Sequence, residues 1–139
     1  MGTAPQLRDL RSAAAFIALA DRPNGGLVFD TFLFHQGRSD LADLAAVPRG
    51  RIFNVQLADA RHMPIERLDM LADRLYPGEG AVPMQTIVDA LSAHGYDGWW
   101  TVELFNPDYL ERPPAEVAAR AHETAAALLA RRPGGALSS

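Results

Sequence analysis

Residues 51–57, Arg-Ile-Phe-Asn-Val-Gln-Leu, alternate apolar and polar side chains with the two-residue period of a β-strand. Three apolar side chains share one face of this predicted strand: Phe53, Val55 and Leu57. Asn54 and Gln56 share the opposite face. Helices are expected to cover the apolar face, so the amide side chains are expected to point to the other side of the sheet.

Two further strands and four helices are predicted around this segment. Residues 27–32, Leu-Val-Phe-Asp-Thr-Phe, are nearly continuously apolar, which is typical of a strand buried on both faces, and residues 99–105 predict a third strand. Spacing, turn and capping residues predict four helices: residues 6–20, Ser39 as N-cap through Ala46, Pro83 as N1 residue to near Gly95, and residues 114–131. Residues 58–82 are a predicted long loop with one helical turn within 65–72. This order calls for an α/β fold with a parallel sheet, and three strands are too few to close a barrel.

The composition describes one soluble globular domain with a sizeable core, since the 139 residues are 48% hydrophobic and 22% charged. We expect this domain to span residues 1–132 and a disordered tail to follow at residues 133–139. The chain has no cysteine, which excludes a disulfide scaffold, a thiolate nucleophile and zinc sites built on sulfur. All 13 basic residues are arginine, so Schiff-base chemistry and the lysine of phosphate-binding loops are excluded too.

Charge and hydropathy limit the partners. The net charge of -4 argues against nucleic-acid binding, which needs a basic patch. The longest apolar stretches, residues 13–20 and 125–130, are far shorter than the roughly 20 residues that span a bilayer, and no secretory signal opens the sequence. We therefore expect a cytoplasmic protein that binds neither nucleic acid nor membrane.

Each predicted strand carries an acidic or amide side chain at its C-terminal end: Asp30, Gln56 and Glu103. The C-terminal ends of parallel strands are where α/β folds place their sites. Two carboxylates and one amide oxygen that converge there suit a hard divalent cation such as Mg²⁺ or Mn²⁺ and, with an added imidazole, Co²⁺. The alternative is that each side chain hydrogen-bonds a neighbouring loop end, which three matching positions make less favourable.

Three further residues are candidates, each with a structural alternative. His35 follows Asp30 in a predicted loop and could act as acid, base or ligand, or be a solvated histidine. Arg74 precedes Tyr-Pro-Gly-Glu-Gly and suits an anionic or polyhydroxylated substrate, although a surface arginine is the more common case. Asp59 either orients a neighbouring ligand through a hydrogen bond or caps the loop.

Four ordered motifs carry a family resemblance: residues 29–32, 55–60, 74–80 and 102–106. Together they resemble the C-terminal part of the sugar phosphate isomerase/epimerase family, the xylose isomerase-like TIM barrels. The likeness covers about residues 7–131. It implies an α/β fold that forms part of a (β/α)8 barrel, with three C-terminal parallel strands and flanking helices.

The resemblance also implies roles for the strand-end residues. It assigns Asp30, Gln56 and Glu103 to a divalent metal (Mn, Mg or Co), Glu103 to proton transfer beside that metal, and Arg74 to substrate contact. The implied reaction is isomerisation or epimerisation of a sugar, sugar phosphate or cyclitol, by proton transfer next to a metal-bound carbonyl. Glutamine at position 56, followed by Leu-Ala-Asp-Ala, is also similar to the 3-dehydroshikimate dehydratases of the same superfamily.

Two departures from the family pattern leave three alternatives. Leu33 stands where many relatives carry histidine, with His35 two residues later, and the family's first glutamate, a ligand and base, belongs to a strand before those found here. The chain is then a shortened form of an ordinary isomerase, a self-assembling half-barrel, or a non-catalytic binding domain. We expect a homo-oligomer, because unpaired edges beside residues 27–32 and 99–105 favour pairing with another chain.

Overall fold

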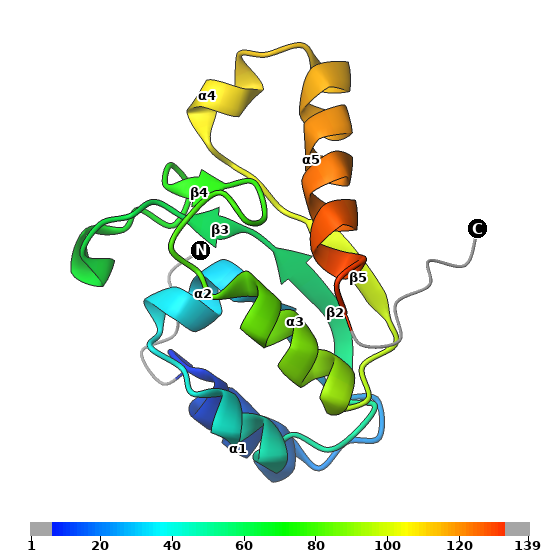
Figure 1. Cartoon of the computed structure of the whole chain (residues 1–139). Coiled ribbons are helices and arrows are strands. Elements are labelled where there is room, and N and C mark those ends of the chain that lie inside the picture. Colours follow the sequence, from blue (N-terminus) through cyan, green and yellow to red (C-terminus); the bar gives the residue numbers. More distant parts are fainter. Residues whose placement is uncertain (1–6, 133–139) are drawn as a thin grey trace.

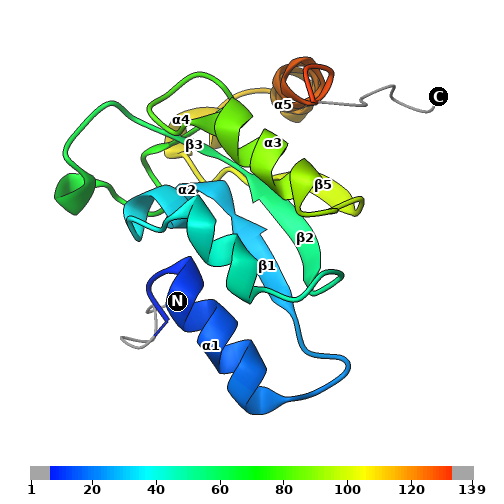
Figure 2. The same cartoon turned by 60° about the horizontal axis from the view of Figure 1, so that its bottom comes forward.

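Three parallel strands form the centre of the fold. The computed structural model describes residues 7–132, so the predicted tail at residues 133–139 and the start of the predicted first helix lie outside the described residues. Strands β1 (Leu27–Asp30), β2 (Ile52–Leu57) and β5 (Trp99–Val102) pair in the order β1-β2-β5. Figure 1 shows β2 and β5, and β1 is labelled in Figure 2. In the described part of the chain this sheet stays open, as expected for part of a TIM barrel.

The helices alternate with these strands in the predicted order. They are α1 (Leu10–Ala20), α2 (Thr31–Gln36), η1 (Leu41–Ala46), η2 (Ile65–Arg67), α3 (Met84–Ala93), α4 (Pro107–Leu110) and α5 (Pro114–Leu129). Figure 2 shows α1 on the outer side of β1, far from α5. Capping sets the start of α1, because Asp9 and Ser12 form a reciprocal capping box that begins the helix at Leu10 rather than at residue 6.

The first strand is shorter than predicted, and the reason is local hydrogen bonding. Thr31 and Phe32 belong to α2 and not to the strand, because the Asp30 carboxylate accepts the Leu33 N–H at 3.0 Å and acts as an N-cap. Ser39 does not cap the next helix as predicted. Its hydroxyl instead accepts the Leu10 N–H at 3.0 Å, at the start of α1. Asp40 caps η1 instead.

Several other predicted boundaries differ from the structure, and β5 ends at Val102 rather than at residue 105. Pro83 precedes α3 as its N-cap and is not its first helical residue. The predicted loop at residues 58–82 contains an antiparallel pair, β3 (Asp59–Ala60) with β4 (Arg74–Leu75), as well as the short η2 helix. A two-residue ladder shows no hydrophobic period, so the sequence pattern could not reveal it.

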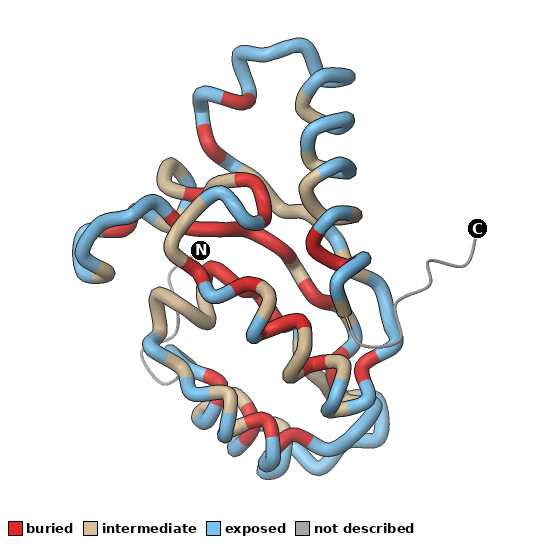
Figure 3. Tube along the Cα trace, viewed as in Figure 1, coloured by how far each residue is buried: buried red, intermediate tan, exposed pale blue. Residues whose placement is uncertain are grey.

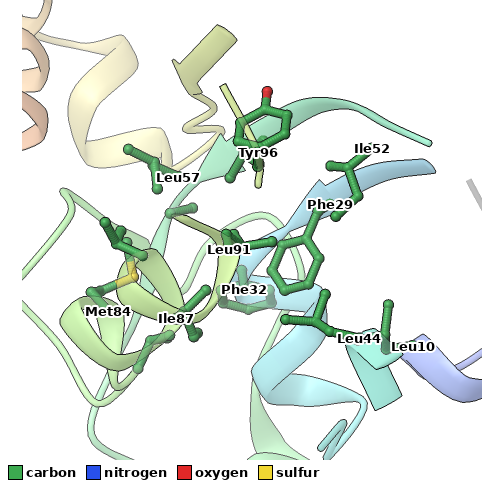
Figure 4. Packing of buried hydrophobic residues seen from close by; sticks show 14 of the residues in the cluster. Leu10, Phe29, Phe32, Leu44, Ile52, Leu57, Met84, Ile87, Leu91 and Tyr96 are labelled. Atoms are coloured by element: carbon green, nitrogen blue, oxygen red, sulfur yellow. The ribbon is translucent and has the colours of Figure 1, made fainter. Parts of the chain in front are cut away.

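The core lies where β2 meets α2 and α3, as Figure 4 shows. Val55 and Leu57 are fully buried, which confirms the apolar face predicted for this strand. Phe53 is 49% exposed although it alternates with Val55 and Leu57, because the β1–β2 register is irregular at the start of β2 and Ile52 is buried in its place. Figure 3 shows the buried residues concentrated along β2 and α3, whereas most of α5 is exposed.

The opposite face of the sheet is open. Val28 and Trp99 are register partners of Asn54 on this face, and they are 57% and 81% exposed. The Asn54 amide donates to the Thr101 hydroxyl at 3.2 Å, so polar side chains line the same face as predicted. Self-association through the outer strand edges stays a prediction. Between residues 7 and 132, no helix combines the length and apolar character needed to cross a membrane.

The core packing predicts a large difference between two leucines on helices. Leu91 on α3 is fully buried, whereas Leu19 on α1 is 85% exposed. We expect Leu91→Ala to lower the free energy of unfolding by about 2–5 kcal/mol, because it leaves a cavity. Leu19→Ala is the matched control and should change it by no more than about 0.5 kcal/mol. Urea unfolding followed by circular dichroism measures both, and equal effects would contradict this packing.

Candidate functional site

The structure brings Asp30, Gln56 and Glu103 together at the C-terminal ends of the three strands. Asp30 and Gln56 are register partners across β1 and β2. The Glu103 N–H donates to the Leu57 carbonyl at 3.2 Å, which continues the β2–β5 ladder by one residue. The Asp30 and Gln56 side chains lie close enough to the Glu103 carboxyl group to shift its pKa. The three side chains therefore lie close together, as predicted. Their binding of a metal ion stays a prediction.

Solvent reaches Glu103 more than it reaches Asp30, the other carboxylate of this cluster. The Glu103 side chain is 31% exposed, against 5% for Asp30. Burial raises the pKa of Glu103, the positive charge of Arg74 opposes this shift, and the negative charge of Asp30 adds to it. A carboxyl group with a raised pKa, placed where a substrate can reach it, is suited to taking and returning a proton near neutral pH.

Arg74 lies against the two carboxylates and is 3% exposed, so the interpretation of Arg74 as a surface arginine is wrong. Its Nη2 donates to Asp30 Oδ2 at 2.8 Å, and its Nε donates to the Met70 carbonyl at 2.8 Å. Its guanidinium carbon lies 4.8 Å from the centre of the Phe32 ring and 5.8 Å from that of Phe105. The guanidinium therefore faces the acids, and its predicted contact with substrate stays untested.

Asp59 holds the loop that follows Arg74. Its buried carboxylate accepts three backbone N–H groups, from Ala60 at 2.8 Å, Gly78 at 3.0 Å and Val82 at 2.8 Å. At Gly80 a Cβ atom would lie 2.1 Å from the Ala60 carbonyl oxygen, so only glycine lets the loop approach so closely. These contacts fit the loop-capping interpretation of Asp59, and none of its described hydrogen bonds reaches the acidic cluster.

Asn106 is a further residue of this region that site prediction missed. Its side chain is buried, its amide donates to the Arg74 carbonyl at 3.1 Å, and its oxygen accepts the Asp108 N–H at 3.0 Å. Asn106 therefore fixes the backbone that carries Arg74. The only signal in the sequence is its place at the end of the motif at residues 102–106.

His35 does not lie in the loop that the sequence predicts. It occupies the last turn of α2, because the Asp30 cap makes residues 31–36 helical. Among the hydrogen bonds of the described residues, none joins the His35 side chain to Asp30, Gln56 or Glu103. Its proposed part in the chemistry stays a prediction.

Asp30, Gln56 and Glu103 could supply some of the ligands of a hard cation, but not a complete coordination shell. Within residues 7–132, no three histidine or acidic side chains lie close enough together to hold a metal ion. Asp30 and Glu103 supply carboxylate oxygens and Gln56 supplies an amide oxygen, which is the donor chemistry of Mg²⁺ and Mn²⁺. Such ions are commonly held by one or two carboxylates and keep water or substrate in their other positions.

Comparison with known proteins finds one matching family, with relatives that are named for two different activities. The family model described as "Xylose isomerase-like TIM barrel" matches residues 2–128. The chain is 33% identical over 112 residues to an inosose isomerase of Halalkalibacterium halodurans, covering 81% of this chain and 39% of that protein. It is also 33% identical over 104 residues to a 3-dehydroshikimate dehydratase of Pseudomonas putida, covering 72% of this chain and 16% of that protein.

A solved structure has the same fold over nearly the whole chain. The crystal structure of the IOLI protein with a binding zinc atom superposes with a TM-score of 0.86 and 28% sequence identity. The match covers 92% of this chain and 46% of that one. This chain therefore spans less than half the length of each of these three relatives.

The three hydrogen bonds of Asp59 predict a local effect of its removal. Asp59→Ala should cost about 1–3 kcal/mol for each buried N–H group that is left without a partner. We expect the Gly78 and Val82 amides to exchange with solvent deuterium much faster in this variant than in the wild type. Asp97→Ala, at an exposed turn residue, is the control and should leave both rates unchanged. Undiminished protection of Gly78 and Val82 in Asp59→Ala would contradict the anchoring role.

Proposed function

This chain belongs to the xylose isomerase-like TIM barrel family, and from this premise we propose that it supplies the C-terminal part of a divalent-metal-dependent isomerase or epimerase site for a sugar, sugar phosphate or cyclitol. The observation that carries the proposal is the convergence of Asp30, Gln56 and Glu103 at the strand ends. The inosose isomerase relatives favour a cyclitol ketone as the substrate class.

Each residue of the cluster has a distinct part in this proposal. Asp30 and Gln56 would hold the cation, together with Glu103. The bound cation supplies polarisation of a substrate carbonyl and an adjacent hydroxyl, which makes the neighbouring C–H bond more acidic. The Glu103 carboxylate takes the proton from that carbon and returns it, which its exposure and raised pKa support.

A dehydratase is the second candidate. Its support is Gln56 at the ligand position, together with the relative in Pseudomonas putida that is named for this activity. Both reactions begin with removal of a proton next to a carbonyl. They differ in the next step, because the dehydratase loses a hydroxyl group as water whereas the isomerase returns a proton.

Hydrogen exchange tests the proposal without assuming the product. The chain is incubated with Mg²⁺ and an inosose in D₂O, and proton NMR follows deuterium entering beside the ketone. We expect Glu103→Gln to slow this exchange by about 10²–10⁴-fold, the usual contribution of a general base. Asp30→Asn should weaken Mg²⁺ binding measured by calorimetry.

The control is Glu111→Gln, which changes an exposed glutamate near the end of α4. It should exchange deuterium at the wild-type rate. Parallel incubation with 3-dehydroshikimate, followed by the ultraviolet absorbance of a dehydrated product, distinguishes the second candidate. Exchange that is as fast in Glu103→Gln as in the wild type would refute the assigned base.

A further inference from the structure

The Arg74 guanidinium is fixed between the two carboxylates of the site by several contacts. Its Nη2 lies 2.8 Å from Asp30 Oδ2, and its Nη1 lies 3.8 Å from Glu103 Oε2. Backbone carbonyls hold it from two further directions, since Nε donates to Met70 at 2.8 Å and Nη1 donates to Glu103 at 3.4 Å. These contacts keep the positive charge of Arg74 close to the two carboxylates.

Solvent screens this charge very little. The side chains of Arg74 and Asp30 are 3% and 5% exposed, and the rings of Phe32 and Phe105 lie beside the guanidinium. Charges in such a setting interact much more strongly than charges on the surface. Anything positive that binds to Asp30 and Glu103 therefore experiences the repulsion of Arg74.

We propose that Arg74 is a positioning residue that acts as the internal counter-cation of this site: it holds Asp30 and Glu103 in place and weakens the binding of a divalent cation to them. The inference rests on the proposed function, from which it takes the ligand set. It differs from substrate contact, because it concerns the charge that Arg74 places on the ligands themselves.

A cation that binds Asp30 would compete directly with Arg74, because both oxygens of the Asp30 carboxylate already accept hydrogen bonds. Its Oδ1 accepts the Leu33 N–H at 3.0 Å, and its Oδ2 accepts Arg74. An incoming cation must therefore share one of these oxygens or displace the arginine. The carboxylates of Asp30 and Glu103 and the guanidinium of Arg74 together carry one net negative charge. Without Arg74, the two carboxylates would carry two.

The size of the effect follows from electrostatics. Removing one positive charge at about 6 Å from a divalent cation should raise the affinity for that cation on the order of tenfold, even with the dielectric constant of water. A lower effective dielectric constant at this buried position makes the expected change larger.

Calorimetric titration of Mn²⁺ into the full chain at fixed ionic strength tests this inference. We expect the Kd of Arg74→Gln to be at least about tenfold lower than that of the wild type. Arg74→Lys retains the positive charge and should stay close to the wild type. Arg67→Gln, which changes an exposed arginine outside the cluster, should leave the Kd unchanged. An equal or higher Kd in Arg74→Gln overturns the inference and leaves the proposed function standing.

A measurement on the wild type covers the case in which Arg74→Gln does not fold. The Nε–Hε resonance of Arg74 is identified in a nitrogen-15 NMR spectrum by its absence from Arg74→Lys. We expect saturating Mg²⁺ to shift this resonance and to accelerate its exchange with water, because the cation takes over the charge of Asp30. A resonance that stays unchanged while Mg²⁺ binds overturns the inference.

Failure of all variants to bind any divalent cation has a separate meaning. It overturns the metal dependence of the proposed function and the inferred effect on affinity. Thermal unfolding in the absence of metal then tests the positioning part, using Asp30→Asn, Arg74→Gln and the double variant. If the double variant is as stable as Arg74→Gln alone, the pair is coupled and Arg74 holds Asp30. If the two losses add, the positioning part is overturned as well.

Discussion

The buried ion pair between Arg74 and Asp30 is the interaction on which the rest of the site depends. A guanidinium with 3% exposure is tolerated only where its charge and its N–H groups have partners, and here those partners come from three segments of the chain. Asp30 ends β1 and begins α2, Met70 lies in the long connection, and Glu103 follows β5. The pair therefore fixes the ends of two strands relative to the connection between β2 and α3.

This arrangement explains why the connection at residues 58–82 is ordered despite its length. Loops of this size carry many backbone groups that need partners. Asp59 provides acceptors for three of those groups, and Asn106 binds the carbonyl of Arg74 from the opposite side. The ordered connection then delivers the guanidinium to the acids. Sheet, loop and site are thus stabilised by the same few buried polar groups.

The sequence predicted the parts of this fold that repeat and missed the parts that depend on distant partners. Alternation in β2 identified the buried side chains of Val55 and Leu57, and the position of strand ends identified the Asp30, Gln56 and Glu103 cluster. The early end of β1 could not be predicted from an apolar run, because it depends on a single hydrogen bond that the Leu33 N–H donates to the Asp30 carboxylate. The burial of Arg74 could not be predicted either, since its partner lies 44 residues away in the sequence.

Relatives with two different activities are compatible with one set of side chains. Removal of a proton beside a carbonyl needs a cation that stabilises the resulting negative charge and a base that can reach the carbon. In the proposed function, Asp30, Gln56 and Glu103 act only in this first step. Whether a proton returns or a hydroxyl leaves would then depend on groups near the other carbons of the substrate. Under this proposal, the three residues supply the chemistry that the two candidate reactions share, and they do not by themselves select the product.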